Sequence, residues 1–216
     1  MKNDRANRWP SILVGIVFAI ASQFLWKAMD RQEGRNIDRL AQLAAARVKS
    51  EISAQIETQT LALVRMARRW EVRGGTPREE WESDASLYTR HMPGFQAIEW
   101  LDPSFQERWI VPMEGNEAVR FFDLHFEERR KNALEMSRDR RGVVVTRALD
   151  LVQDGKGFQV NVPVFEGADF GGFMIGIFRV QELFDFILHP HLAAGYAIAV
   201  YDDEEEIYKR GDIPEE

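Results

Sequence analysis

The chain has 216 residues, of which 45% are hydrophobic and 11% aromatic, so it can bury a substantial core and is not a disordered chain. It contains no cysteine, which excludes disulfides, zinc–thiolate sites and cysteine nucleophiles. Its formal net charge of −7 argues against a nucleic-acid partner, because binding to phosphates requires a basic surface.

The N-terminal segment predicts a membrane anchor. An uncharged run from Ser11 to Trp26 follows three basic residues, and Trp9 and Trp26 stand near its two ends. A membrane-spanning helix needs about 20 apolar residues, and indole rings favour the headgroup level. A signal peptide cleaved after Ala21 and a buried core helix are the alternatives.

The basic residues before the apolar run set the expected orientation, because positively charged flanks stay on the cytoplasmic side. We therefore expect residues 1–10 to be cytoplasmic and residues 11–29 to cross the inner (cytoplasmic) membrane. Residues 30–216 are then periplasmic or extracellular.

Residues 30–72 predict one long amphipathic helix. The segment has no proline and a single glycine, and its apolar residues recur mostly at steps of three and four. At about 1.5 Å per residue it is roughly 60 Å long, so part of it should project as a stalk. A narrow apolar seam favours a homodimer through this helix, and packing along the chain's own sheet is the alternative. The seam consists of Ile37, Leu40, Ala44, Val48, Ile52, Ile56, Leu63 and Met66.

The first half of residues 73–189 predicts two helices around a β-hairpin. Thr76 is the expected N-cap, with Pro77 at the first position of a helix that ends at His91. Strands are expected at Phe95–Leu101 and Arg108–Val111, followed by a helix from Leu124 to Ser137. The inward-facing residues of that helix are expected to be Phe126, Ala133 and Met136.

Three apolar, β-branched runs follow, at Val143–Val152, Phe158–Phe165 and Phe170–Val180. The connections between them are too short for parallel crossovers, so they predict an antiparallel meander. The last run is apolar on both faces and should lie at the centre of the sheet. The fold class is therefore α+β, with a PAS-like antiparallel five-stranded sheet and flanking helices.

The tail predicts a helix at Gln181–His189 and strands at Tyr196–Tyr201 and Ile207–Lys209. We expect residues 73–189 to form a membrane-distal PAS-like subdomain that binds the ligand, and residues 190–216 to begin an incomplete membrane-proximal one. Two strands cannot bury a core alone, so the chain is expected to be part of a longer receptor. Alternatively, the tail completes the sheet of one domain.

Three segments carry a resemblance to a known family: PGFQAIEWLD at Pro93–Asp102, RKNALEMSRDRRG at Arg130–Gly142 and GFQVNVPVFEG at Gly157–Gly167. They closely resemble the CHASE domain, the extracytoplasmic ligand-sensing module of histidine kinases and of diguanylate and adenylate cyclases. The resemblance covers the chain from Ile37 to its end. It implies a long stalk helix carrying two PAS-like domains, of which the membrane-distal one holds the ligand.

The resemblance also suggests ligand-binding positions on the helix before the meander. Arg130 and Asn132 match the family's helix motif. Cytokinin-binding plant members hold the adenine group with an acidic residue where this chain has Arg129, so the resemblance argues against cytokinin. A basic residue there could suit an anion, and a solvated helix face is the alternative.

In a PAS-like sensor the ligand lies between the sheet and the helices that cross it. Polar residues that break the apolar strands are therefore candidates, with ordinary surface amides as the alternative for Gln159 and Asn161. Gly176 would leave room for a ligand or for a close helix. The candidate ligand-binding positions are Arg129, Arg130, Asn132, Thr146, Asp150, Gln159, Asn161 and Gly176.

Motifs for enzyme chemistry are missing from the sequence, which has no glycine-rich phosphate loop and no HExxH helix. His189 and His191 flank a proline in what is expected to be an ordinary loop. We expect no catalytic residue, metal or cofactor in this chain. The leading hypothesis is a sensor for an unknown small molecule, and the alternatives are a membrane-anchored interaction or structural domain and, with least support, a secreted enzyme.

Overall fold

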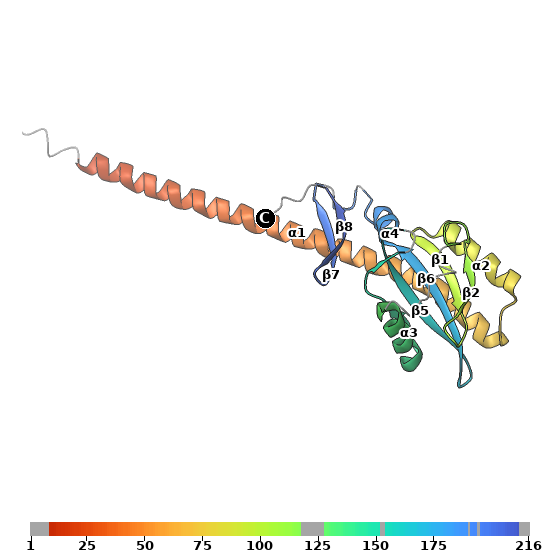
Figure 1. Ribbon diagram of the computed structural model, residues 1–216. Coiled ribbons are helices and arrows are strands. Elements are labelled where there is room, and N and C mark those ends of the chain that lie inside the picture. Colours follow the sequence, from red (N-terminus) through yellow and green to blue (C-terminus); the bar gives the residue numbers. More distant parts are fainter. Residues whose placement is uncertain (1–8, 118–127, 152–153, 190, 194, 212–216) are drawn as a thin grey trace, which may run out of the picture. The chain divides into compact units, whose positions relative to one another are not determined.

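The computed structural model describes residues 9–117, 128–151, 154–189, 191–193 and 195–211. The chain divides into two units, Met1–Arg47 and Val48–Glu216, and each is described by itself. Helix α1 (Trp9–Arg73) begins in the first unit and ends in the second (Figure 1). The predicted membrane segment and the predicted stalk therefore belong to one uninterrupted helix.

The first unit consists of the N-terminal part of α1. By length and composition the helix is apolar enough to cross a membrane, with a mean hydropathy of 1.4 over its best 18 residues. Phe18, Phe24 and Trp26 are exposed by 71%, 73% and 69%. Side chains of this kind find a favourable environment in a hydrocarbon layer. The expected cytoplasmic segment, residues 1–10, lies mostly outside the described residues.

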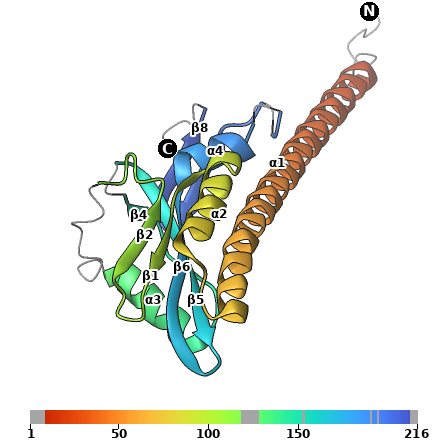
Figure 2. The same cartoon turned by 90° about the vertical axis from the view of Figure 1, so that its right-hand side faces the viewer.

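The second unit is built on one antiparallel sheet with the strand order β2-β1-β6-β5-β3, in which the short β4 also pairs with β5 (Figure 2). The central position predicted for the last strand of the meander, β6, is confirmed. The strands are β1 (Phe95–Leu101), β2 (Glu107–Val111), β3 (Val144–Val145), β4 (Leu149–Asp150), β5 (Lys156–Glu166) and β6 (Asp169–Arg179).

Helices cover both faces of this sheet. The C-terminal part of α1, α2 (Arg78–His91) and α4 (Val180–Ile187) pack on one face, where Met174 and Phe178 of β6 are buried. Helix α3 (Glu128–Arg140) packs on the other face, where Leu134 belongs to the same apolar cluster as Ile175. We call these the α1 face and the α3 face. Strand alternation assigns each residue of β6 to one of them.

A tryptophan cluster closes the α1 face. The ring centroids of Trp70, Trp100 and Trp109 lie 4.5 to 5.6 Å apart, with Trp70 stacked on Trp100, and the centroid of Trp81 lies 5.4 Å from that of Trp109. The indole N–H of Trp81 donates to the sulfur of Met174. These four rings come from α1, α2, β1 and β2, so they fix the end of α1 against the sheet.

The apolar seam predicted along the stalk divides into two parts. Leu63 and Met66 are buried in the core of the second unit, so the C-terminal part of the seam packs along the chain's own sheet. Ile37 and Leu40 are exposed by 58% and 56%. An apolar surface for a second copy is therefore available only toward the N-terminal part of the seam.

The first strand of the predicted meander is interrupted, and this gives six strands where five were expected. The Thr146 hydroxyl, instead of its carbonyl, accepts the hydrogen bond from the N–H of Gln159. The N–H of Ala148 donates to the carboxylate of Asp202. Side-chain acceptors compete with the ladder here, so residues 146–148 leave the sheet between β3 and β4. Residue 152 lies outside the described residues.

Two predictions about helix ends and faces were wrong. Pro77, and not Thr76, occupies the N-cap position of α2, and no side chain caps that end. Met136 of α3 is 41% exposed, whereas Ala133 is buried as expected. Helix α3 continues to Arg140, and the predicted start at Leu124 and the residue Phe126 lie outside the described residues.

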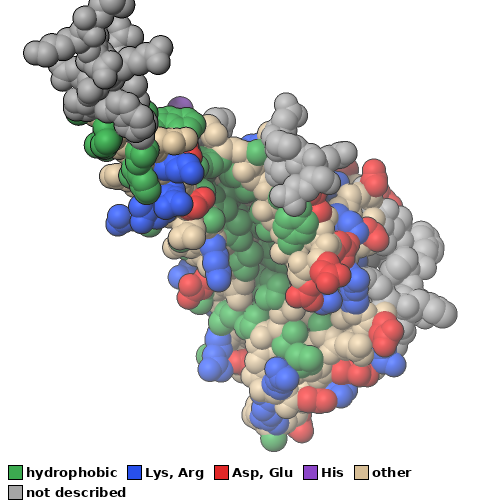
Figure 3. All heavy atoms as spheres, turned by 90° about the vertical axis from the view of Figure 1, so that its left-hand side faces the viewer, with side chains coloured by type: hydrophobic (Ala, Val, Ile, Leu, Met, Phe, Trp, Pro, Cys, Tyr) green, Lys and Arg blue, Asp and Glu red, His purple; other side chains and the backbone are tan. Residues whose placement is uncertain are grey.

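The tail forms a separate two-stranded sheet of β7 (Ile198–Asp202) and β8 (Glu205–Arg210). The alternative that the tail completes the large sheet is therefore wrong. The subdomain boundary at residue 190 stays a prediction. On the face shown in Figure 3, basic and acidic side chains are interspersed and hydrophobic side chains gather in a band between them.

Candidate functional site

Five polar side chains from four elements meet on the α3 face, beneath helix α3. Four of them are almost completely buried: Glu99 is 2% exposed, Arg130 4%, Gln159 1% and Asn161 0%. We call this set the α3-face polar cluster: Glu99 of β1, Glu107 of β2, Arg130 of α3, and Gln159 and Asn161 of β5.

The sheet register places these side chains on one face. Glu99 lies opposite Ile175 of the central strand β6, and Asn161 lies opposite the same isoleucine from the other side. Gln159 lies opposite Ile177, which is buried against the α3 face together with Ile175. Because residues two apart point to the same face of a strand, Gln159 and Asn161 both project toward α3.

A hydrogen-bond chain connects Arg130 to β5. Arg130 Nη1 donates to Gln159 Oε1 at 3.3 Å, and Gln159 Nε2 donates to Asn161 Oδ1. The Ser137 hydroxyl donates to the backbone oxygen of Asn161 at 3.2 Å. Asn161 Nδ2, at the end of this chain, has no hydrogen-bond partner among the described residues.

Glu99 is the acidic member of the cluster that is buried most completely. Burial, and to a lesser extent the nearby charge of Glu107, raise the pKa of its carboxyl from 4.5 to about 7 against the opposing effect of the charge of Arg130. Glu99 Oε2 has no hydrogen-bond partner in the described part of the chain. Near neutral pH this carboxyl can therefore exist in either protonation state.

Unpaired polar atoms in a protein interior are costly, so most of them find a partner in the protein, in water or in a ligand. Here an amide donor of Asn161 and a carboxyl oxygen of Glu99 lie on the same buried face, on either side of Ile175. Such a pair can hold a small polar molecule by hydrogen bonds. The arrangement suits recognition, because fixed donors and acceptors give specificity.

The structure brings together four of the eight predicted positions. Arg130, Gln159 and Asn161 belong to the cluster, and Thr146 supports Gln159 through the hydrogen bond from its backbone N–H. The alternatives of a solvated helix face for Arg130 and of surface amides for Gln159 and Asn161 are therefore wrong. These residues are buried because α3 covers the face on which β5 presents them.

The other four predicted positions lie elsewhere. Arg129 donates to the backbone oxygen of Ala148 and pairs with Glu205. Asn132 is exposed on α3.

Asp150 is exposed, and the hydrogen bond from Lys156 lowers the pKa of its carboxyl. A Cβ at Gly176 would lie 2.7 Å from Leu63 of α1, so this glycine makes room for a close helix.

Two members of the cluster, Glu99 and Glu107, were missed by sequence reasoning. A signal was present, because Glu99 is a lone charge inside the strand FQAIEWL and shares its face with Ala97 and Leu101. A charge on the apolar face of a strand is unusual unless it has a partner or a function. The sequence does not show that the five residues of the cluster lie together, because they come from segments as far apart as β1 and β5.

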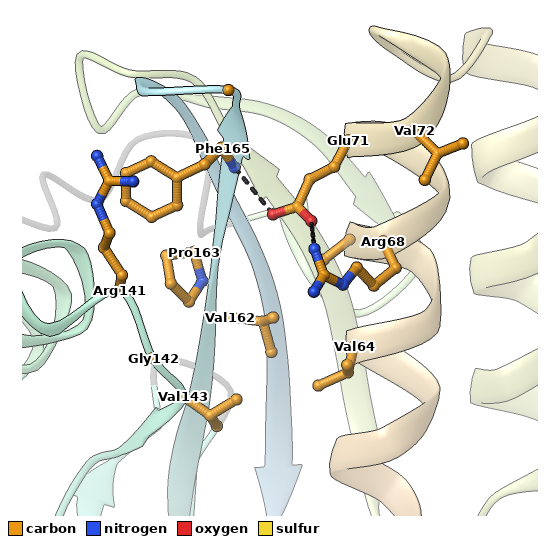
Figure 4. A pocket seen from close by; sticks show the side chains of 12 residues that line it. Val64, Arg68, Glu71, Val72, Arg141, Gly142, Val143, Val162, Pro163 and Phe165 are labelled. Carbon is orange, nitrogen blue, oxygen red and sulfur yellow. Dashed lines mark hydrogen bonds and ion pairs between the residues drawn. The ribbon is translucent and has the colours of Figure 1, made fainter.

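A second feature, the groove in Figure 4, lies between α1 and the outer edge of β5 and has a volume of about 550 Å³. The Glu71 carboxylate accepts hydrogen bonds from the N–H of Phe165 at 3.0 Å and from Arg68 at 2.6 Å. Pro163 has no N–H, and the guanidinium of Arg141 lies 4.3 Å from the Phe165 ring centroid. These features protect a sheet edge against pairing with another strand.

Among the described residues, no group of three or more His, Cys, Asp or Glu side chains could hold a metal ion. The α3-face polar cluster is therefore the candidate ligand site. Its members are held by a sheet and a helix, and Asn161 Nδ2 and Glu99 Oε2 have no hydrogen-bond partner among the described residues.

Comparison with known proteins gives a family and a fold. The family model of the CHASE domain matches residues 77–208. No curated protein matches the sequence at a significant level.

Several solved structures share the fold. An extracellular ligand-binding receptor from Desulfohalobium retbaense has a TM-score of 0.60 at 14% identity, over 76% of this chain and 30% of that chain. The ligand-binding domain of the Pseudomonas aeruginosa amino-acid chemoreceptor PctC, in complex with GABA, has a TM-score of 0.56 at 14% identity, over 79% of this chain and 74% of that one. The ligand-binding domain of the Pseudomonas fluorescens chemoreceptor CtaA, in complex with L-alanine, has a TM-score of 0.55 at 14% identity, over 79% of this chain and 70% of that chain.

Proposed function

Because the chain belongs to the CHASE domain family, we propose that it is the ligand-sensing part of a membrane-bound signal-transduction receptor and that it binds a small molecule at the α3-face polar cluster. The observation that carries this proposal is the pair of unpartnered, buried polar atoms on Glu99 and Asn161. A purely structural cluster would be expected to satisfy its own hydrogen bonds.

The solved structures with this fold support a ligand of modest size. Two of those described above are complexes with GABA and L-alanine, and a further chemoreceptor domain, PctB of Pseudomonas aeruginosa, is a complex with L-Gln. A small polar molecule is compatible with the hydrogen-bonding groups of the cluster. Arg129 pairs with Glu205 and does not face this cluster, so an anion at that position is not part of the proposal.

Signal transmission would use helix α1. Its C-terminal part packs against the sheet, with Leu63 over Gly176 of β6, and its N-terminal part is apolar enough to cross a membrane, where the sequence predicts a span at residues 11–29. A ligand shifts such a helix only by its differential affinity for two arrangements of the protein.

We propose that two copies pair through the exposed apolar residues near Leu40, with residues 30–216 outside the inner membrane. The output domain would be a histidine kinase or a nucleotide cyclase in the longer protein.

Ligand binding can be tested by thermal unfolding of the full chain in detergent micelles, in the presence of amino acids, amides, purines and carboxylic acids in turn. The tryptophan cluster reports unfolding through its fluorescence. We expect at least one compound to raise the melting temperature of the wild type and of Asn132→Leu, which changes an exposed amide on α3, but not of Asn161→Leu.

A compound that stabilises Asn161→Leu as much as the wild type would contradict binding at this cluster. If no compound acts and a protein is instead co-purified on the exposed surface of the head, the interaction-domain alternative is favoured. Orientation has its own test, since alkaline phosphatase fused after Gly211 is active only when that end of the chain is exported.

A further inference from the structure

The hydrogen-bond pattern of the cluster defines the chemical class of the ligand more narrowly than its size does. Resting on the proposed function, we infer that the ligand carries a compact neutral group with adjacent hydrogen-bond acceptor and donor, such as a primary carboxamide. The acceptor would bind Asn161 Nδ2 and the donor would bind Glu99 Oε2, which are two of the buried atoms without a hydrogen-bond partner among the described residues.

The donor character of Asn161 follows from Arg130. A guanidinium can only donate, so the side chain of Gln159 must turn its oxygen toward Arg130. The NH₂ group of Gln159 then faces Asn161, which must accept with its own oxygen. The NH₂ group of Asn161 is therefore the free end of the chain, and its orientation is fixed by hydrogen bonding. A ligand atom that completes it must carry a lone pair.

The acceptor character at the other side comes from Glu99. Its Oε2 atom lies on the same face, and the neighbouring carboxylate of Glu107 adds negative charge, while the guanidinium of Arg130 supplies the opposing charge. Two carboxyl groups and one guanidinium make this a poor site for an anion, because like charges in a buried setting repel strongly. The ionised form of Glu99 favours a ligand N–H or O–H group directed at it.

The spacing of the strands makes one compact group sufficient. Glu99 and Asn161 stand on β1 and β5 with only Ile175 of β6 between them, so their backbones are roughly 10 Å apart. Their side chains point to the α3 face, as does that of Ile175, so a group that joins them by two hydrogen bonds of about 2.9 Å would lie over Ile175, beneath α3. A carboxamide has its donor and its acceptor on one carbon and matches the pair.

Three isosteric fragments separate the possible classes: acetamide, acetate and acetamidine. Acetamide offers both functions, acetate offers acceptors only, and acetamidine offers donors with a positive charge. Binding is measured by saturation-transfer NMR with the full chain in detergent micelles. We expect acetamide to bind the wild type at least about tenfold more tightly than acetate, since one unmatched buried hydrogen bond is worth about that factor. Acetamidine should fall between the two, because it leaves Asn161 without an acceptor.

Glu99→Gln supplies the sharpest variant, because it preserves side-chain shape and places an amide opposite Asn161. We expect it to bind acetate more tightly than the wild type does, since both flanking groups can then donate and the repelling charge is gone. Asn161→Leu should lose acetamide binding about tenfold or more. Asn132→Leu, which changes an exposed amide on the same helix as Arg130, should bind all three fragments as the wild type does.

The outcomes separate the two proposals. If acetate binds the wild type as tightly as acetamide and loses affinity in Asn161→Leu, the inferred ligand class is wrong, while small-molecule sensing at this cluster stands. If no fragment binds, or if Glu99→Gln and Asn161→Leu leave every fragment unaffected, the cluster is structural and both proposals are overturned. Tryptophan fluorescence verifies that each variant is folded, and Glu99→Gln keeps the test decisive if Asn161→Leu does not fold.

Discussion

Glu99→Gln is predicted to change how the stability of the protein depends on pH. Burial raises the pKa of Glu99 from 4.5 to about 7 in the folded protein. Between these two pH values the folded protein keeps a proton that the unfolded chain has released. The folded state therefore loses stability, relative to the unfolded state, as the pH rises through this interval. Glutamine has no such proton in either state, so the substitution removes this loss.

The size of the effect follows from the interval between the two pKa values. Each pH unit is worth about 1.4 kcal/mol, so a rise from 4.5 to about 7 corresponds to at most about 3 kcal/mol. We expect Glu99→Gln and the wild type to have similar stability at pH 4 and the variant to be more stable at pH 8. For a unit of this size, about 3 kcal/mol corresponds to a difference of roughly 6–12 °C in melting temperature.

Thermal unfolding of the full chain in detergent micelles, followed by tryptophan fluorescence from pH 4 to pH 8, measures this difference. Comparing variant with wild type at each pH cancels the titration of groups that do not interact with Glu99. The matched control is Glu79→Gln, which removes one exposed carboxylate from α2 and should follow the wild type. Parallel curves for Glu99→Gln and the wild type would refute the buried, proton-binding state of Glu99.

Three further predictions concern contacts outside this carboxyl. Arg130→Ala should destabilise the folded state by about 3 kcal/mol because it removes the buried guanidinium of the cluster. Arg129→Ala should cost less than about 1 kcal/mol, because the Arg129 side chain is 48% exposed. Equal losses of stability in thermal unfolding would contradict this. Glu71→Ala should cost about 1–2 kcal/mol by uncapping the edge of β5, and Glu71→Gln, which keeps an acceptor, should recover most of it in the same assay. Leu40→Cys in this cysteine-free chain should form a disulfide-linked dimer on oxidation in membranes several times faster than Arg39→Cys, and equal rates would argue against pairing through the seam.

The regular elements were predictable because their patterns are local. The run Phe170–Val180 has apolar residues on both of its alternating faces, which predicted a strand buried on both sides, and β6 is central in the sheet. The interruption of Val143–Val152 was not predictable in this way, since it depends on the hydroxyl of Thr146 and the carboxylate of Asp202. These acceptors compete with the hydrogen bonds of the sheet, and the competition depends on the positions of β5 and of the tail, which are distant in the sequence.

The candidate site could be predicted only in part, for a related reason. Strand alternation shows that Gln159 and Asn161 share a face, but not whether that face meets water or a helix. Helix α3 decides it, and so turns two ordinary amides into buried groups that need partners. The place of Glu99 in the site also depends on tertiary structure. Its distance from Asn161 is set by the pairing of β1 with β6, two strands that are separated by some 75 residues of the sequence.

The first turn of α3 places two neighbouring arginines in different environments. Arg130 points into the polar cluster and donates to Gln159, while Arg129 donates to Ala148 and pairs with Glu205 at the start of β8. Successive residues of a helix differ by about 100° in direction, so a rotation or displacement of this turn moves both side chains together. Any ligand that draws Arg130 or Gln159 toward itself would therefore also alter the contact of Arg129 with the tail. This turn therefore connects the candidate ligand site to the two-stranded sheet.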